Sequence, residues 1–82
     1  MSTQKTTTRT LHEIAREIRK VWANVHYSAK PYLDAMSQMG SVKENFMFDS
    51  GHDIVIRFLG NATTWRGEDA RRIKAELKQM CK

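Results

Sequence analysis

Residues 11–25 carry an apolar stripe with the spacing of an α-helix, and no other feature of the chain constrains its fold as strongly. The apolar positions recur at intervals of three and four, as one side of a helix requires. Thr10 lies just before the stripe and Glu13 follows three residues later, which is the pattern of a capping box. We therefore predict a helix from residue 11 to about residue 25. The stripe consists of Leu11, Ile14, Ala15, Ile18, Val21, Trp22 and Val25.

Two further segments show helical spacing. A second helix is predicted to begin near Ser28, with Pro31 in its first turn, where a missing N–H does no harm. Gly40 is predicted to end it in a left-handed conformation. Thr63 or Thr64 is predicted to cap a last helix that has acids in its first turn and lysines in its last. The apolar line of that helix is Ala70, Ile73, Leu77, Met80 and Cys81.

Residues 54–59, with the sequence IVIRFL, have two interpretations. Their β-branched and aromatic side chains favour a strand. Their apolar positions also fit one face of a helix, and a lone strand in so short a chain would lack a partner. We favour the helix, with residues 49–53 as its start signal. Upstream, residues 41–44 repeat the capping-box pattern and predict one helical turn that places Phe46 or Phe48 in the core.

Together these segments predict an all-α fold, a compact bundle of three main helices plus one or two short helices. The 82 residues make one domain, which we place at residues 10–82 after a disordered tail at residues 1–9. Short connections favour antiparallel neighbours. The predicted core consists of Leu11, Ile14, Ile18, Trp22, Leu33, Met36, Ile54, Phe58, Ile73 and Leu77.

No residues in the sequence have the pattern of a catalytic, cofactor or metal site. The histidines lack the i, i+4 spacing of a helical metal site, and Cys81 is the only cysteine. The glycines are too far apart for a phosphate loop, and the serines form no nucleophile motif. We therefore predict no enzyme activity, no cofactor and no metal. The longest apolar run is three residues, so we expect a cytoplasmic protein that does not bind a membrane.

The net charge of +5 favours an anionic partner, DNA or RNA first. Two basic stripes are the candidate contacts, and they can merge into one basic face if the first and last helices pack as neighbours. The alternative is a solvated surface whose bases are offset by nearby acids. The first stripe consists of His12, Arg16, Arg19 and Lys20, and the second of Arg71, Lys74, Lys78 and Lys82, with Arg66 and Arg72 near by.

Trp65 precedes the last helix and also has two interpretations. The favoured one is a packing anchor that covers the junction of two helices. In the other, Trp65 and Arg66 form an exposed hot spot for a protein partner, since both residue types are enriched in such sites. A helix-turn-helix around residues 60–63 is a further alternative, with Arg66, Arg71 and Arg72 at the front of a recognition helix.

Three stretches, LHEIAREIRK, KPYLDAM and FLGNATTWRGEDARRIKAEL, are the basis of a resemblance. Through them the chain resembles a group of small uncharacterised proteins of bacterial genomes, phages and mobile elements. The resemblance implies no activity and no site residue, only an accessory role toward host or phage machinery. Our leading hypothesis is a non-enzymatic nucleic-acid-binding accessory protein. The alternative is a protein-interaction module, either a homodimer or an inhibitor of a host or phage factor.

Overall fold

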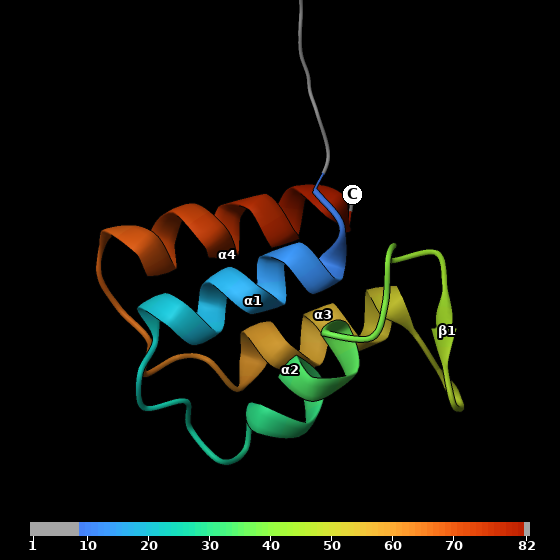
Figure 1. Ribbon diagram of the computed structural model, residues 1–82, viewed down its shortest axis with the longest axis horizontal. Coiled ribbons are helices and arrows are strands. Elements are labelled where there is room, and N and C mark those ends of the chain that lie inside the picture. The colour runs from blue at the N-terminus through green and yellow to red at the C-terminus, as the bar shows by residue number, and fades with distance from the viewer. Residues whose placement is uncertain (1–8, 82) are drawn as a thin grey trace, which may run out of the picture.

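A computed structural model describes residues 9–81 and shows a mostly helical chain (Figure 1). Its four helices are α1 (Leu11–Val21), α2 (Lys30–Met36), α3 (Gly51–Gly60) and α4 (Glu68–Met80). Two short strands, β1 (Asn45–Phe46) and β2 (Asp49–Ser50), pair antiparallel as a hairpin before α3. The helical prediction is confirmed, and the hairpin is an element that the sequence analysis did not foresee.

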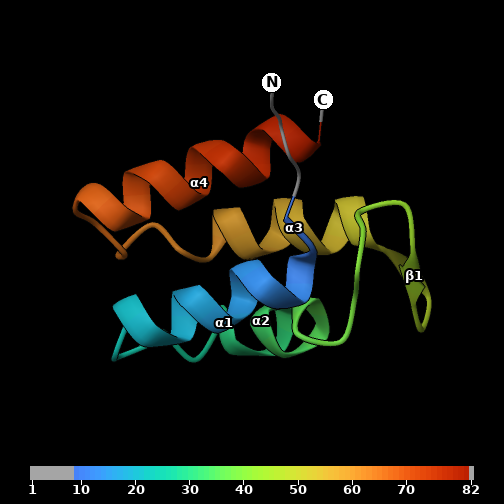
Figure 2. The same cartoon turned by 45° about the horizontal axis from the view of Figure 1, so that its top comes forward.

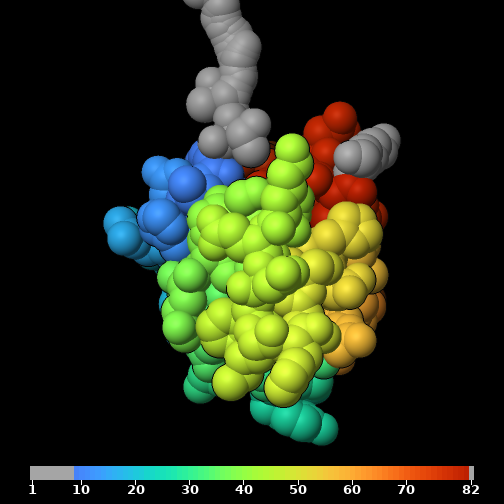
Figure 3. Space-filling view, turned by 90° about the vertical axis from the view of Figure 1, so that its right-hand side faces the viewer, coloured from blue at the N-terminus to red at the C-terminus, as the bar shows by residue number. Residues whose placement is uncertain are grey.

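The four helices lie around one core, and going around it they follow the order α1, α2, α3, α4. Helix α1 contacts α2 and α4, and α3 contacts the same two helices (Figures 1 and 2). The hairpin lies at one end of this arrangement and is seen face-on, in yellow-green, in Figure 3. All ten predicted core residues are buried, at most 8% exposed. The periodicity of the sequence therefore identified the inner faces of the helices correctly.

Helix α1 begins as predicted and ends earlier. The capping box is present, with the Thr10 hydroxyl accepting from the Glu13 N–H and the Glu13 carboxylate accepting from the Thr10 N–H at 2.9 Å. The helix ends at Val21, not near residue 25, because Trp22 leaves the helical conformation (φ −117°, ψ 86°). The predicted tail lies outside the described residues up to residue 8. Its last residue, Arg9, is held by two carboxylates.

Helix α2 keeps Pro31 in its first turn, but the prediction for Gly40 is wrong. The helix spans only seven residues, and the Ser37 hydroxyl donates to the Asp34 carbonyl at its end. Among the described residues, Met47 and Gly67 are those with positive φ, so Gly40 is not left-handed. The Gly40 carbonyl instead accepts from the Leu11 N–H at 3.1 Å, which satisfies a free donor at the start of α1.

The helical turn predicted for residues 41–44 is wrong, whereas the helix predicted for residues 54–59 is confirmed within α3. The Glu44 carboxylate accepts from the Gly40 N–H at 3.2 Å, and the chain continues into the hairpin. Phe46 packs partly buried against the core, and Phe48 is fully exposed. Ser50 then caps α3 by accepting from the Asp53 N–H at 3.1 Å.

Candidate nucleic-acid interface

The connection between α3 and α4 carries Trp65, which is buried. Trp65 is 4% exposed, and its ring stacks on Trp22 with centroids 5.1 Å apart and planes at 6°. The structure thus shows the packing anchor, and Trp65 offers no exposed hot spot for a partner. The predicted threonine cap is wrong, because α4 has Gly67 as its N-cap and no side-chain capping bond.

The helix-turn-helix alternative does not fit this connection. Residues 61–67 separate the two helices, whereas the motif uses a turn of about three to four residues. Arg66 lies in the connection and not on the front of α4. The indole of Trp65 also occupies the junction between the helices as part of the core.

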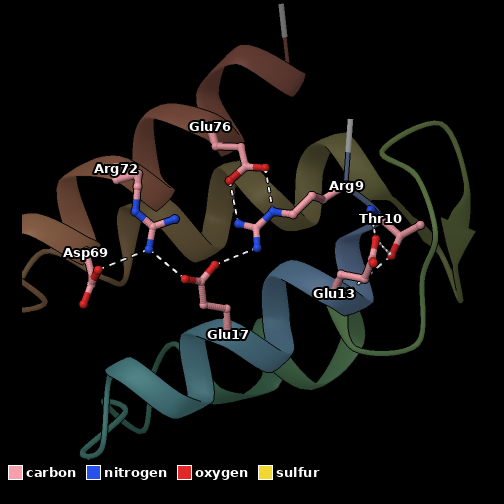
Figure 4. A network of polar contacts seen from close by, with 7 residues as sticks. All are labelled: Arg9, Thr10, Glu13, Glu17, Asp69, Arg72 and Glu76. Atoms are coloured by element: carbon pink, nitrogen blue, oxygen red, sulfur yellow. Dashed lines mark hydrogen bonds and ion pairs between the residues drawn. The ribbon is translucent and has the colours of Figure 1, made fainter. Parts of the chain in front are cut away.

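A network of ion pairs fills the seam between α1 and α4 (Figure 4). Arg9 lies between the two helices and donates to Glu17 of α1 at 2.6 Å and to both carboxylate oxygens of Glu76 of α4 at 2.6 and 3.0 Å. Arg72 of α4 donates to Glu17 at 2.7 Å and to Asp69 at 3.1 Å. Three carboxylates and two guanidinium groups therefore pair along this seam, and together they carry a net charge of −1.

The same network changes the acidity of its members. Hydrogen bonds from Arg72, and then from Arg9, lower the pKa of Glu17 below its usual 4.5. The hydrogen bond to Glu17 raises the pKa of Arg72. Because the charge of Arg72 is paired twice within the protein, this residue is a weaker candidate for a phosphate contact than its sequence position suggested.

The other side of α4 carries a row of bases that we call the α4 ridge, defined as Arg66, Arg71, Lys74 and Lys78. The last three follow one another at i, i+3 and i+7, which places them on one side of a helix. The seam residues of α4 lie on the opposite side of its buried line of Ala70, Ile73 and Leu77. No member of the α4 ridge forms an ion pair with any residue from 9 to 81.

Lys74 is the residue of the α4 ridge whose side chain is held by contacts within the protein. Its ammonium group donates to the Trp65 carbonyl at 2.7 Å and lies 5.9 Å from the centroid of the Trp65 ring. Partial burial, and then the charges of Lys78 and Arg66, lower the pKa of Lys74. Lys78 and Arg66 are thus close enough to Lys74 to disfavour its charged form, and an anion bound beside Lys74 would offset that effect.

The basic residues of α1 do not extend the α4 ridge. Arg16 and Lys20 are exposed, and Arg19 pairs with Asp34 of α2. Although α1 and α4 are neighbours, the ridge lies on the side of α4 away from α1, and the carboxylates of the seam separate the two sets. The predicted stripes therefore do not merge into one face. Lys82 lies outside the described residues.

The hairpin turn is a feature that the sequence analysis missed. Phe48 is fully exposed and Met47 is 84% exposed. Met47 also has a φ of 59°, a conformation that costs L residues other than glycine about 1–2 kcal/mol. The run FMF at residues 46–48 was the available signal, because three consecutive side chains cannot all lie on one face of a helix or strand. In the structure, Phe46 is the one that packs against the core.

Comparisons with protein-family models, with curated proteins and with solved structures give no match for this chain. Within residues 9–81, no group of three or more His, Cys, Asp or Glu side chains is placed to hold a metal ion. No helix in the described part of the chain is long and apolar enough to cross a membrane.

Proposed function

We propose that the protein is a non-enzymatic nucleic-acid-binding accessory protein and that the α4 ridge is its contact surface. The observation that carries the proposal is a row of four bases with no carboxylate partner among residues 9–81. Elsewhere on the described surface, Arg9, Arg19, Arg57 and Arg72 pair with acids. The other bases without an ion pair in the described part of the chain do not form a row of four; they are Arg16, Lys20, Lys30 and Lys43. The proposal includes that the protein works in the cytoplasm and that it acts on host or phage machinery.

Four phosphate contacts set the expected strength of salt dependence. Each phosphate that a base neutralises releases counterions, and the logarithm of the binding constant falls by about 0.9 per contact for each tenfold rise in salt. Four contacts give a slope of about −3.6. Affinity for duplex DNA should therefore fall by about 100-fold between about 50 and 200 mM salt.

Adjacent arginines on α4 offer a matched test. Fluorescence anisotropy with a labelled mixed-sequence DNA duplex measures the affinity of each variant over a range of salt concentrations. Arg71→Gln removes a base of the α4 ridge and should reduce the salt slope by about 1. Arg72→Gln removes the same charge one residue away, from the seam, and should leave the slope close to that of the wild type. Absence of binding by the wild type at low salt, or equal effects of the two variants, would contradict the proposal.

The hairpin turn favours the second candidate, a protein-interaction module. Met47 and Phe48 expose apolar surface on a short hairpin, and Met47 does so in a strained conformation, a combination typical of contact sites. Sedimentation equilibrium over a range of protein concentrations tests the homodimer form of this hypothesis. Phe48→Ser should abolish self-association, and Ile56→Ser, at an exposed position on α3, is the control. A wild-type chain that remains monomeric throughout would exclude the homodimer.

A further inference from the structure

We infer that the α4 ridge binds double-stranded nucleic acid through its phosphates and reads no bases. The inference rests on the proposed function and specifies the ligand of the same surface. It follows from what surrounds the four bases, namely the aromatic groups, the amide groups and the acids of α4.

The α4 ridge lacks an aromatic platform for single strands. Proteins that bind single strands without sequence preference stack the bases on exposed aromatic rings. Trp65 is the aromatic residue beside the ridge, and it is 4% exposed, with one face on Trp22 and the ammonium of Lys74 over its ring. The exposed aromatics Tyr27 and Phe48 lie before α2 and in the hairpin, on other elements. The α4 ridge therefore offers no exposed aromatic ring on which unpaired bases could stack.

The first turn of α4 is unsuited to reading a groove. Helices that read DNA place their N-terminal residues against base edges between two rows of phosphates. Here the first two helical residues are Glu68 and Asp69, both exposed, and their carboxylates would face those phosphates. The side of α4 that carries Arg71, Lys74 and Lys78 meets no such repulsion. We therefore place the side of the helix, and not its end, against the backbone.

The ridge also lacks the amide side chains that read adenine. Asn and Gln make the bidentate contacts to adenine in the major groove. The amide residue of α4 is Gln79, which lies about 100° around the helix from Lys78 and so off the ridge. Arg66 and Arg71 could read guanine only from within the groove, which the carboxylates of the first turn disfavour. The two lysines act as point charges toward phosphate. The chemistry of the ridge is thus that of backbone contact.

A row of closely spaced bases also favours the ligand with the higher charge density. Successive ridge positions on α4 lie about 5–6 Å apart, and a duplex presents one charge for about every 1.7 Å along its axis. The salt slope is about 0.9 per contact for duplex DNA and about 0.7 for single strands. For four contacts the two slopes differ by about 0.8. With equal binding of both ligands at about 1 M salt, this difference gives about tenfold tighter binding of the duplex at about 50 mM salt.

The test compares four labelled probes with the full-length protein: an A·T-rich DNA duplex, a G·C-rich DNA duplex, one separated strand, and an RNA duplex. We expect both DNA duplexes to bind equally within about twofold, because a protein that reads bases loses about fivefold or more per mismatched pair. We expect the separated strand to bind about tenfold more weakly. The RNA duplex shares the phosphate chemistry, and its affinity relative to the DNA duplexes shows which duplex supplies the natural ligand.

Failure of the inference and failure of the proposed function are distinguishable. Tighter binding of the single strand, or a difference of fivefold or more between the DNA duplexes, would overturn the inference and retain the function. No binding of any probe at low salt would overturn both. Lys74→Gln should weaken duplex binding and reduce the slope by about 1. Lys20→Gln removes an equal charge from α1 and should leave both unchanged, and an equal effect of the two would refute the assignment to the α4 ridge.

Discussion

Trp22 and Trp65 stack face to face, with ring centroids 5.1 Å apart, and so join the end of α1 to the connection before α4. Phe58 of α3 and Trp22 form a T-shaped contact, with ring centroids 6.3 Å apart and ring planes at 71°. Helix α1, helix α3 and the connection that follows α3 therefore meet at one aromatic cluster. The same cluster supports the α4 ridge, because Lys74 rests on the carbonyl and the ring of Trp65.

Removing the Trp65 indole should destabilise the whole fold. Trp65→Ala leaves a large cavity beside Trp22, and such truncations lower the free energy of unfolding by about 3–5 kcal/mol. Urea denaturation followed by circular dichroism measures the change. Trp65→Phe keeps part of the stacked surface and should lose less. An alanine variant as stable as the wild type would show that the stacked pair does not hold α1 and α4 together.

Met47→Gly should stabilise the protein. The φ of 59° at Met47 suits glycine, which adopts it without steric conflict, and the expected gain is about 1 kcal/mol. The side chain of Met47 is 84% exposed, so its removal sacrifices little packing. Phe48→Gly is the matched control, because Phe48 does not have positive φ and the change should bring no gain. Thermal denaturation measures the stability of the two variants, and equal effects would refute the assignment of strain to Met47.

Gly51→Ala and Gly60→Ala should act in opposite directions. A Cβ at Gly51 would lie 2.7 Å from the Cα of Val42 and 2.8 Å from the Ser41 carbonyl oxygen, both backbone atoms that cannot move aside. We expect a clear loss of stability and a displaced hairpin. A Cβ at Gly60 meets no atom within 4 Å at the end of α3, so alanine should gain up to about 1 kcal/mol. Chemical denaturation of both variants tests the pair.

Acid should loosen the seam between α1 and α4. The pKa of Glu17 is lower in the folded protein than its usual 4.5, chiefly through Arg72, so the folded state binds fewer protons between those two values. The stabilisation is complete above pH 4.5 and is lost as pH falls through the lower, folded pKa. The urea concentration at the midpoint of unfolding should decrease as the pH is lowered over this acidic range.

The variant Glu17→Gln separates this effect from other carboxylates. It should be less stable than the wild type at neutral pH, and its stability should depend less steeply on acid. Some dependence should remain, because the backbone hydrogen bond from Thr10 also lowers the pKa of Glu13. If the variant and the wild type lose stability in parallel, the pairing of Glu17 with Arg72 and Arg9 contributes nothing in solution.

Local patterns predicted the helices and the core, because both depend on periods of three and four residues. The helical face of residues 54–59 and the line through Ile73 and Leu77 have this property. The stripe predicted over residues 11–25 has it as far as Ile18, whereas Val21 is exposed and ends the helix. The hairpin was not predictable in the same way. The pattern of residues 41–44 suggested a capping box, but the structure uses these groups in contacts with other parts of the chain. The Glu44 carboxylate accepts from the Gly40 N–H, and the Gly40 carbonyl accepts from the Leu11 N–H.

The candidate site shows a similar division. Sequence identified all the bases of the α4 ridge but could not separate Arg71 from Arg72. A step of one residue turns the helix by about 100°, and the position of α1 decides which arginine meets Glu17. Composition counts both charges equally, whereas packing pairs one and leaves the other facing solvent.

Gly67, the N-cap of α4, has φ 112° and ψ −176°, and beyond the adjoining residues no atom lies within 4 Å of where a Cβ would be. A side chain at this position would therefore meet no steric obstacle from the rest of the fold. Glycine is favoured because these backbone angles are the mirror image of an ordinary extended conformation, which L residues rarely adopt. A chemically synthesised chain with D-alanine at residue 67 should fold more stably than the natural one, and its L-alanine counterpart less stably.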